Sequence, residues 1–290
     1  MLRQNISALD HIICGVPDLA AARKTFTSLG FVLSPVGDHA GYGSHNQCVV
    51  FPHHYLELFT FYDRTAFPMH PMIPLVDRIG EHVLGVAYAT GDAEAAHAAL
   101  QEAGLSVPHP VFRQARHMKD DQGRVYEGDV AVGHLPPSLQ PTMFSFVCQH
   151  FNRETMWRQE WIEHPNKING LRDARLYTPD TATYQATKKA FTALFESAVN
   201  DERDDRFSVS IGPDTLIIED YNAAVHGFDD GIFAAPEPHA FIGLITLTSP
   251  DLDETLRILN AAEPVARAYP DRLIIPARHA HGTVLQIVPA

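Results

Sequence analysis

The sequence predicts an α+β fold made of four βαβββ units that pair into two domains. Three observations predict it. A strand-like run, a turn with aspartate and a helical run recur four times along the 290 residues. Shorter strand-like runs follow each helical run. The four turn aspartates, Asp18, Asp92, Asp180 and Asp251, stand 74, 88 and 71 residues apart. Such a period indicates repeated supersecondary units, and four of about 70 residues fill the chain.

Each unit opens with a strand and then a helix. The expected strands are 10–16, 83–90, 171–178 and 241–249, and the expected helices are 19–29, 93–103, 181–197 and 252–262. Aspartate at the turn can cap the free N–H groups of the first helical turn. Gly30 and Gly104 follow the first two helices, where a left-handed residue usually ends a helix. Apolar residues at helical spacing, such as Ala22, Phe26 and Leu29, support these helices.

Shorter strands are expected after each helix. They are 31–36, 47–51 and 55–61 in the first unit, 143–148 at the end of the second, 207–211 and 215–219 in the third, and 271–275 and 283–288 in the fourth. One unit leaves a sheet face uncovered, so two units pair around a shared cleft. We therefore expect domains at 1–165 and 166–290, joined at Pro165-Asn166-Lys167.

Composition excludes several classes of function. Hydrophobic residues at 45% and charged residues at 20% fit a globular protein with a core. The net charge of −13, without a cluster of Lys and Arg, argues against nucleic acid or an anionic membrane as a partner. No apolar run approaches the ~18 residues of a membrane span. Cys14, Cys48 and Cys148 lie in strand-like apolar runs, which indicates reduced core cysteines and a cytoplasmic protein.

Histidines are concentrated in the first part of the chain. Thirteen of the 17 lie at or before His164. Because imidazole is a common metal ligand and a near-neutral acid or base, this asymmetry predicts a site in that half. For most single histidines the surface is the better expectation. We assign the following to the surface or to an exposed turn: His53, His54, His70, His97, His109, His117 and His134.

Specific motifs in residues 9–166 resemble the vicinal oxygen chelate superfamily, which includes glyoxalase I, extradiol dioxygenases, fosfomycin-resistance enzymes and bleomycin-binding proteins. The first unit carries the resemblance in three runs: Leu9-Asp10-His11, Val16-Pro17-Asp18-Leu19 and Tyr55-Leu56-Glu57-Leu58. Residues 39–46 and 149–166 resemble its glyoxalase-like branch. The resemblance implies two glyoxalase-like domains. The fold alone does not give the function, because it carries several chemistries.

In metal-dependent members, a histidine of the first strand and a glutamate of the fourth can bind a divalent metal. By position these are His11 and Glu57. Glu57 lies in an apolar strand, where an unpaired carboxylate is costly, so it is predicted to be a metal ligand or catalytic base. An edge-strand position facing water is the alternative. The later units have other residues at the two positions: Gly85 with Phe144 or Phe146, Asp173 with Ile218, and Leu244 with Gln286. The second domain is therefore expected to be degenerate.

The branch motifs supply the other candidate residues. His45 is a candidate catalytic residue, and His150 a candidate for metal or substrate binding. Asn46, Arg158, His164 and Asn166 are candidates for substrate binding, and Arg158 could clamp a carboxylate. A set of two histidines and one carboxylate, such as His11, Glu57 and His45 or His150, would suit iron, manganese, nickel or zinc.

The resemblance favours a metal-assisted lyase or isomerase that acts on an oxygenated small molecule. Two alternatives stay open. The first is a metal-free protein of the bleomycin-resistance type that binds and sequesters a small molecule, which the missing ligands of the second unit favour. The second is an extradiol-type dioxygenase, which would need Fe(II). Residues 167–290, which lack the His–Glu pair, are expected to be a structural or dimerising partner, and this allows a homodimer.

Overall fold

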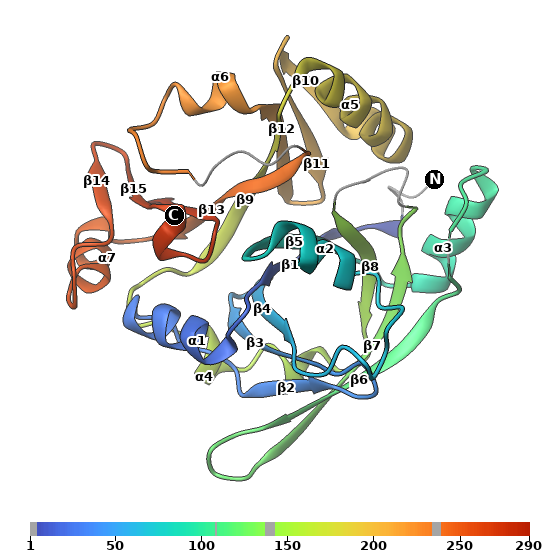
Figure 1. Ribbon diagram of the computed structural model, residues 1–290, viewed down its shortest axis with the longest axis horizontal. Helices are drawn as coiled ribbons and strands as arrows, with labels where there is room; N and C mark the ends of the chain where they lie inside the picture. Colours follow the sequence, from blue (N-terminus) through green and yellow to red (C-terminus); the bar gives the residue numbers. More distant parts are fainter. Residues whose placement is uncertain (1–4, 108, 137–142, 234–238) are drawn as a thin grey trace.

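The structure is a computed structural model that describes residues 5–107, 109–136, 143–233 and 239–290. It contains two eight-stranded sheets (Figure 1). The first is a closed barrel in the order β1-β4-β3-β2-β6-β7-β8-β5. The second is open, in the order β10-β11-β12-β9-β13-β16-β15-β14. The predicted α+β fold of four units in two paired halves is confirmed.

Two units form the barrel. The first comprises β1 (Ala8–Gly15), α1 (Leu19–Ser28), β2 (Val36–His39), β3 (Ser44–Val50) and β4 (Tyr55–Phe61). After α2 (Ile73–Ile79), the second comprises β5 (His82–Ala89), α3 (Ala93–Glu102), β6 (Phe112–Lys119), β7 (Val125–His134) and β8 (Phe144–His150). A short 3-10 turn (Arg153–Thr155) and α4 (Gln159–Ile162) then lead to the second sheet.

The other two units form the open sheet. The third comprises β9 (Gly170–Thr178), α5 (Thr181–Phe195), β10 (Val199–Arg203), β11 (Arg206–Ile211) and β12 (Asp214–Asp220). After α6 (Tyr221–Val225), the fourth comprises β13 (Phe241–Ser249), α7 (Leu252–Leu259), β14 (Arg267–Tyr269), β15 (Arg272–Ile275) and β16 (Val284–Pro289). In the part of the chain that the structure describes, no helix is both long and apolar enough to cross a membrane.

The repeated aspartates act as predicted. Asp18, Asp92, Asp180 and Asp251 each occupy the N-cap of a helix, and each side chain accepts a backbone N–H of the first turn. Gly30 and Gly104 have φ values of 79° and 74° just after α1 and α3. The capping signals therefore place the four long helices correctly.

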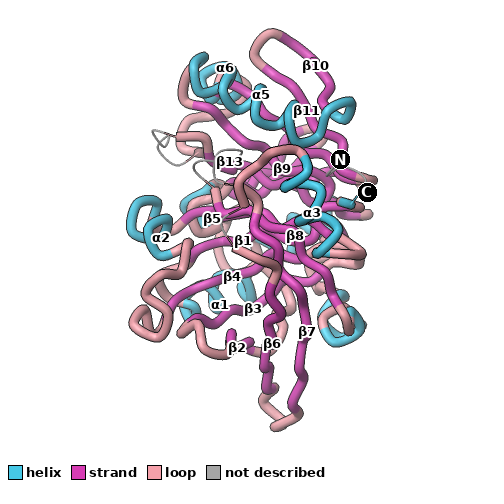
Figure 2. Tube along the Cα trace, turned by 90° about the vertical axis from the view of Figure 1, so that its right-hand side faces the viewer, coloured by secondary structure: helices cyan, strands magenta, loops and turns pink. Residues whose placement is uncertain are grey.

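The shorter strands differ more from the prediction. Residues 31–35 are not a strand, and β2 begins only at Val36. At Ser34 a side chain takes part in the contact with β3 in place of a regular backbone ladder. The Ser34 N–H donates to the Cys48 carbonyl, and the Ser34 hydroxyl accepts the Cys48 N–H. The β6–β7 hairpin projects beyond the barrel (Figure 2). This long hairpin lies in the unit with the widest aspartate spacing.

A single hydrophobic cluster joins the two sheets. It includes Ile12 and Leu56 of the barrel and Ala174, Ile245 and Leu285 of the open sheet. Asp214 adds polar contacts between the sheets: its carboxylate accepts the Leu9 N–H at 2.8 Å and bonds His54 Nε2 at 2.9 Å. His54 is thus buried, and its assignment to an exposed turn was wrong. The domain boundary between residues 165 and 166 stays a prediction.

The inner face of the open sheet is filled by the chain's own side chains. Tyr177, Leu244 and Val284 of this face pack in one cluster with Ile232 and other, partly exposed residues of α6 and the following segment: Tyr221, Ala224, Phe228 and Phe233. α6 lies on the side of this sheet that faces away from the barrel (Figure 1). The cleft that the barrel keeps open is thus occupied in the second half.

Candidate functional site

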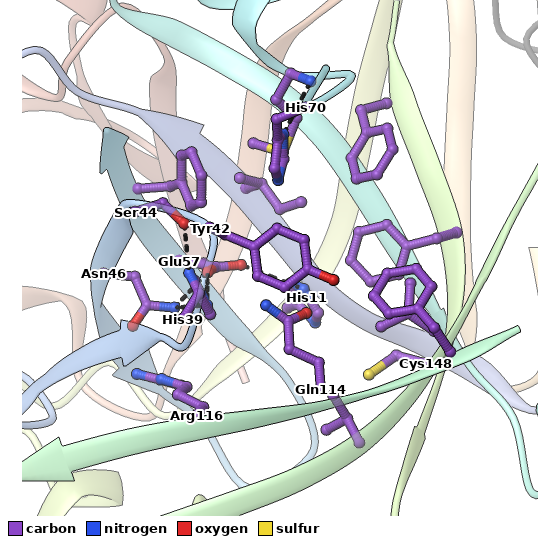
Figure 3. A pocket seen from close by; sticks show the side chains of 18 of the residues that line it. His11, His39, Tyr42, Ser44, Asn46, Glu57, His70, Gln114, Arg116 and Cys148 are labelled. Carbon is purple, nitrogen blue, oxygen red and sulfur yellow. Dashed lines mark hydrogen bonds and ion pairs between the residues drawn. The ribbon is translucent and has the colours of Figure 1, made fainter. Parts of the chain in front are cut away.

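The barrel encloses a cavity of about 340 Å³ (Figure 3). Its polar lining residues include His11, His39, Asn46, Glu57, Gln114, Arg116 and His150. Its apolar wall includes Phe59, Phe112, Val132, Phe144 and Phe146. This size and this mixture of a few polar groups with an apolar wall are typical of sites for small organic molecules.

A β-bulge in β1 turns two successive residues into the barrel. β1 pairs with β5 so that Leu9 lies opposite Tyr88 and His11 opposite Ala87, which leaves Asp10 unmatched. Bulges often re-aim side chains at functional sites. Here the fully buried Asp10 carboxylate accepts a hydrogen bond from His11 Nδ1 at 2.6 Å and one from His150 Nε2 at 3.1 Å.

His11 lies between two carboxylates. Its Nε2 is 3.3 Å from Glu57 Oε2, and its ring stacks on Tyr55 at 4.3 Å between centroids. Burial alone would lower the pKa of His11, but the hydrogen bonds to Asp10 and Glu57 outweigh it and raise the pKa to about 9. Burial would raise the pKa of Glu57, but His11 lowers it to about 2. At neutral pH the pair is therefore an imidazolium and a carboxylate.

Glu57 continues the hydrogen-bond network on its other side. Asn46 Nδ2 donates to Glu57 Oε1 and to His39 Nε2, and His39 Nδ1 bonds Ser44 Oγ at 3.0 Å. Burial lowers the pKa of His39 to about 4, so His39 is neutral and its Nε2 can accept. These side chains lie close together on one wall of the cavity (Figure 3).

Arg116 is a second buried cation at the cavity, with 8% of its surface exposed. Its guanidinium meets weak acceptors: Met156 Sδ at 3.0 Å, Cys48 Sγ at 3.4 Å and Ser34 Oγ at 3.5 Å. Gly37 makes room for it, because a Cβ there would lie 2.2 Å from Arg116 Nε. The nearby positive charge of Arg116 also helps to keep Glu57 ionised.

Four predicted residues line this cavity: His11, Asn46, Glu57 and His150. The others lie outside its lining. His45 follows Ser44 and precedes Asn46 on β3, so it faces the other side, against Tyr62. Arg158 pairs with Glu160 at 2.7 Å. Their predicted roles stay untested.

His164 and Asn166 are buried in backbone contacts. The His164 ring accepts the Val32 N–H at 3.1 Å and bonds the Val50 carbonyl at 3.0 Å. The Asn166 amide donates to the Leu29 carbonyl at 2.9 Å, just after α1. These contacts hold the segment after α4 against the first unit, and a role in substrate binding stays a prediction.

Several histidines of the cavity were missed by sequence reasoning. His134 is 8% exposed and His70 is partly buried, and both line the cavity, so their assignment to the surface was wrong. Burial lowers the pKa of each to about 4. The alternation of Val130, Val132 and His134 along β7 was an available signal. His39 lies in the quoted motif, but its role in the network depends on contacts with other strands.

The second unit supplies no counterpart of the His11–Glu57 pair. Gly85 lies opposite Phe144 and Ala87 opposite Phe146, as His11 lies opposite Tyr55 and Ile13 opposite Glu57. Phe146 therefore holds the glutamate position. In the third unit, the register of β12 against β9 places Asp173 at the position of His11 and Ile217 at the position of Glu57. The residue predicted for the glutamate position was Ile218, one residue further along the chain. A four-ligand metal site built from both units does not fit these residues.

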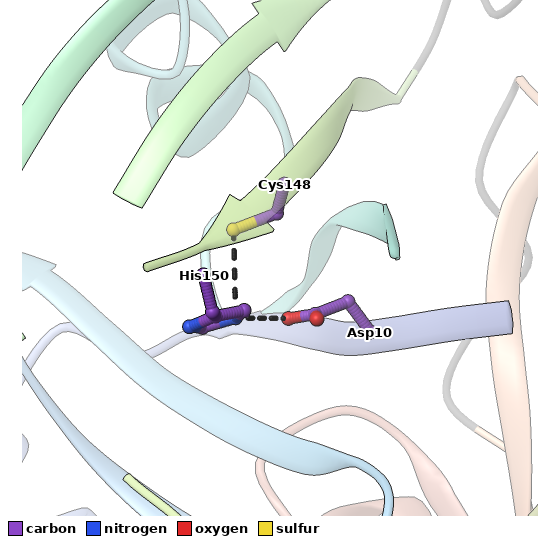
Figure 4. A group of neighbouring side chains, drawn as sticks. All are labelled: Asp10, Cys148 and His150. Atoms are coloured by element: carbon purple, nitrogen blue, oxygen red, sulfur yellow. Dashed lines mark hydrogen bonds and ion pairs between the residues drawn. The ribbon is translucent and has the colours of Figure 1, made fainter. Parts of the chain in front are cut away.

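One group in the described residues does converge as metal ligands would. Donor atoms of Asp10, Cys148 and His150 all lie within 4.8 Å of one another (Figure 4). The predicted set of His11, Glu57 and His150 does not form such a group in that part of the chain. Cys14, Cys48 and Cys148 are all buried and unpaired by disulfides, as expected.

The paired βαβββ units and the His–Glu pair inside the barrel are the features of a glyoxalase-like protein. The chain belongs to the glyoxalase-like domain family, whose model matches residues 9–195. No curated protein matches the sequence.

Solved structures share the fold over nearly the whole chain. A hypothetical protein from Staphylococcus aureus is 13% identical with a TM-score of 0.67, covering 97% of this chain and 99% of its own. A mutant of 4-hydroxymandelate synthase from Streptomyces coelicolor is 11% identical with a TM-score of 0.60, covering 98% and 92%. A xylose isomerase-like TIM barrel/4-hydroxyphenylpyruvate dioxygenase fusion protein is 10% identical with a TM-score of 0.58, covering 98% and 48%.

Proposed function

We propose that this protein is a small-molecule enzyme of the lyase or isomerase type, which moves a proton on an oxygenated substrate held in the barrel. The arrangement of Asp10, His11 and Glu57 carries this proposal. An imidazolium and a carboxylate 3.3 Å apart, both lining one cavity, form an acid and a base that can act on the same small molecule.

Each residue has a defined part in the proposed step. When substrate binds, His11 Nε2–H turns from Glu57 to the carbonyl oxygen of the substrate, while Asp10 holds His11 Nδ1–H and thereby fixes the ring. Loss of the hydrogen bond from His11 makes Glu57 a stronger base. Glu57 takes the proton from the carbon next to that carbonyl, and the electron pair moves onto the oxygen. Asn46 holds Glu57 Oε1 in place. Return of the proton to another carbon, or loss of a leaving group, completes an isomerase or a lyase reaction.

Metal assistance is a separate part of the proposal. Zinc, nickel, manganese or iron on His11, Glu57 and His150 would act as a Lewis acid on the substrate oxygen. An ion on His11 and Glu57 would take the place of the His11 Nε2 proton, so the proton transfer described above belongs to the protein without this ion. Metal analysis of His11→Ala and Glu57→Ala beside the natural protein tests it, because an ion held there is lost in both variants.

Exchange of substrate protons with solvent tests the proposed reaction. A panel of α-hydroxy and α-oxo carbonyl compounds is incubated with the protein in D₂O and followed by NMR. We expect deuterium to enter next to the carbonyl of the true substrate. Glu57→Gln should lower this rate by about 10²-fold or more, since a general base contributes that much. Glu102→Gln, at an exposed position, is the matched control.

One observation favours a second candidate, a metal-free protein that binds and sequesters a small molecule. Phe146 stands in the second unit where Glu57 stands in the first, so that position of the cavity wall is apolar. Saturable binding of panel compounds without any exchange or turnover would support this candidate against the enzyme. The extradiol-type dioxygenase stays a prediction, and oxygen uptake with catechols after loading with Fe(II) tests it.

A further inference from the structure

Asp10, Cys148 and His150 bring a carboxylate, a thiol and an imidazole around one point beside the cavity (Figure 4). We infer that these three residues form a binding site for a thiophilic divalent ion, of which zinc is the leading candidate. Zinc binds all three of these ligand types, whereas magnesium and calcium prefer oxygen ligands alone. The inference does not rest on the proposed function.

The two donor distances to His150 Nε2 match a tetrahedral site. His150 Nε2 is 3.6 Å from Cys148 Sγ and 3.1 Å from Asp10 Oδ1. With zinc bonds of about 2.3 Å to sulfur and about 2.0 Å to nitrogen and oxygen, tetrahedral geometry separates sulfur from nitrogen by about 3.6 Å and nitrogen from oxygen by about 3.3 Å. Both distances to His150 Nε2 therefore lie within a few tenths of an ångström of tetrahedral zinc, and the donor atoms of Asp10 and Cys148 lie within 4.8 Å of each other.

Hydrogen bonds alone do not satisfy this group. His150 Nε2 can carry at most one proton, yet both Asp10 Oδ1 and Cys148 Sγ lie next to it. Asp10 Oδ2 is fully buried and has no hydrogen-bond partner. An unpaired buried carboxylate oxygen is costly. An ion between the three side chains would bind His150 Nε2, Cys148 Sγ and the Asp10 carboxylate at once, and a carboxylate bound through both oxygens would also satisfy Oδ2.

The site opens toward the cavity. Cys148 and His150 line the cavity, while Asp10 lies behind them with no exposed surface. Three protein ligands and one side open to the cavity leave the fourth coordination position to water or a substrate oxygen. This open position distinguishes catalytic from structural zinc sites. Asp10 Oδ1 also bonds His11, so one carboxylate would connect the ion with the acid–base pair.

Cobalt(II) gives a direct test, because a thiolate ligand produces a charge-transfer absorption in the near ultraviolet. The full chain is stripped with a chelator and titrated with Co²⁺ alone, and the zinc content of separately loaded protein is measured by mass spectrometry. We expect one ion per chain and the thiolate band in the natural protein. Cys148→Ala should lose both the band and the bound zinc.

Cys14→Ala is the matched control, because Cys14 is also a buried free cysteine on a barrel strand but packs in the core between the sheets. It should keep the band. Circular dichroism checks the fold of each variant, and His150→Asn tests the same site through loss of bound zinc if Cys148→Ala does not fold. A natural protein without the band would overturn the inference. So would an ion that persists in Cys148→Ala and His150→Asn but is lost in His11→Ala and Glu57→Ala.

Discussion

His11 owes its charge to two carboxylates that come from different strands. Its folded pKa of about 9 lies above the ordinary value of 6.5. The stabilisation from this charge is therefore complete below about pH 6.5 and is lost as the pH rises through about 9. The pKa of Glu57 is shifted in the opposite direction, from 4.5 down to about 2. Its contribution to the free energy of unfolding is therefore lost only in acid.

We predict that the free energy of unfolding falls between pH 6.5 and 9 by up to about 3 kcal/mol. His11→Gln should remove most of this slope, because the variant has no imidazole to deprotonate. Urea unfolding at a series of pH values measures both. The control is His117→Gln, since the His117 side chain is 47% exposed and 3.5 Å from Glu127. An unchanged slope in His11→Gln would show that another group titrates.

Single residues show what sequence can and cannot reveal. The apolar run around Glu57 predicted that its carboxylate needs a partner, and His11 is that partner. Asp10 was not predicted, because strand alternation assigns it to the face opposite His11, and only the bulge opposite β5 turns both inward. Arg116 was missed for a related reason: its burial depends on Gly37, which lies about 80 residues earlier in the chain.

At the scale of elements, local signals located the helices better than the strands. A capping aspartate and a following glycine act within a few residues, so α1 and α3 were predicted within one residue of their ends. The start of β2 depends instead on Ser34, whose bonds to Cys48 cross from another strand. Such contacts between distant residues leave no periodic pattern in the sequence.

The turn between β2 and β3 holds a segment that lines the cavity. The Gly43 carbonyl accepts the Tyr62 and Asp63 N–H groups at 2.9 and 3.0 Å. Gly43 has a φ of 63°, and a Cβ there would lie 1.9 Å from the Asp63 carbonyl oxygen. The segment after β4, which contributes Phe67 and Met72 to the cavity lining, is therefore held by hydrogen bonds to this turn.

Gly43→Ala should destabilise the protein by about 2–4 kcal/mol, because it adds overlap with Asp63 to the cost of a left-handed alanine. Gly41→Ala isolates that second cost. Gly41 has a φ of 82° with open space around it, so we expect about 1–2 kcal/mol. Denaturant unfolding compares the two. The backbone amides of Tyr62 and Asp63 should exchange faster with solvent in Gly43→Ala only. Equal exchange rates in both variants would contradict the role of the hydrogen bonds to Gly43.

On the scale of the whole molecule, the shared core predicts that the barrel and the open sheet unfold together. Asp214, which is 4% exposed, serves both the Leu9 N–H and His54. Asp214→Ala should cost about 2–4 kcal/mol, because it leaves two buried groups without a partner. Asp121→Ala is the control, since that side chain is 95% exposed. Calorimetry of the natural protein should show one transition, and two separate transitions would contradict a shared core.

The filled inner face of the second sheet also bears on how the protein would respond to its ligand. Tyr177, Phe233 and their neighbours occupy the volume that the barrel leaves open. Among the described residues, the four units thus form a cavity within the barrel, while side chains occupy the corresponding face of the second sheet. Titration should reach one equivalent per chain along a hyperbolic curve, and a sigmoidal curve would have to come from communication between chains rather than between the halves of one chain.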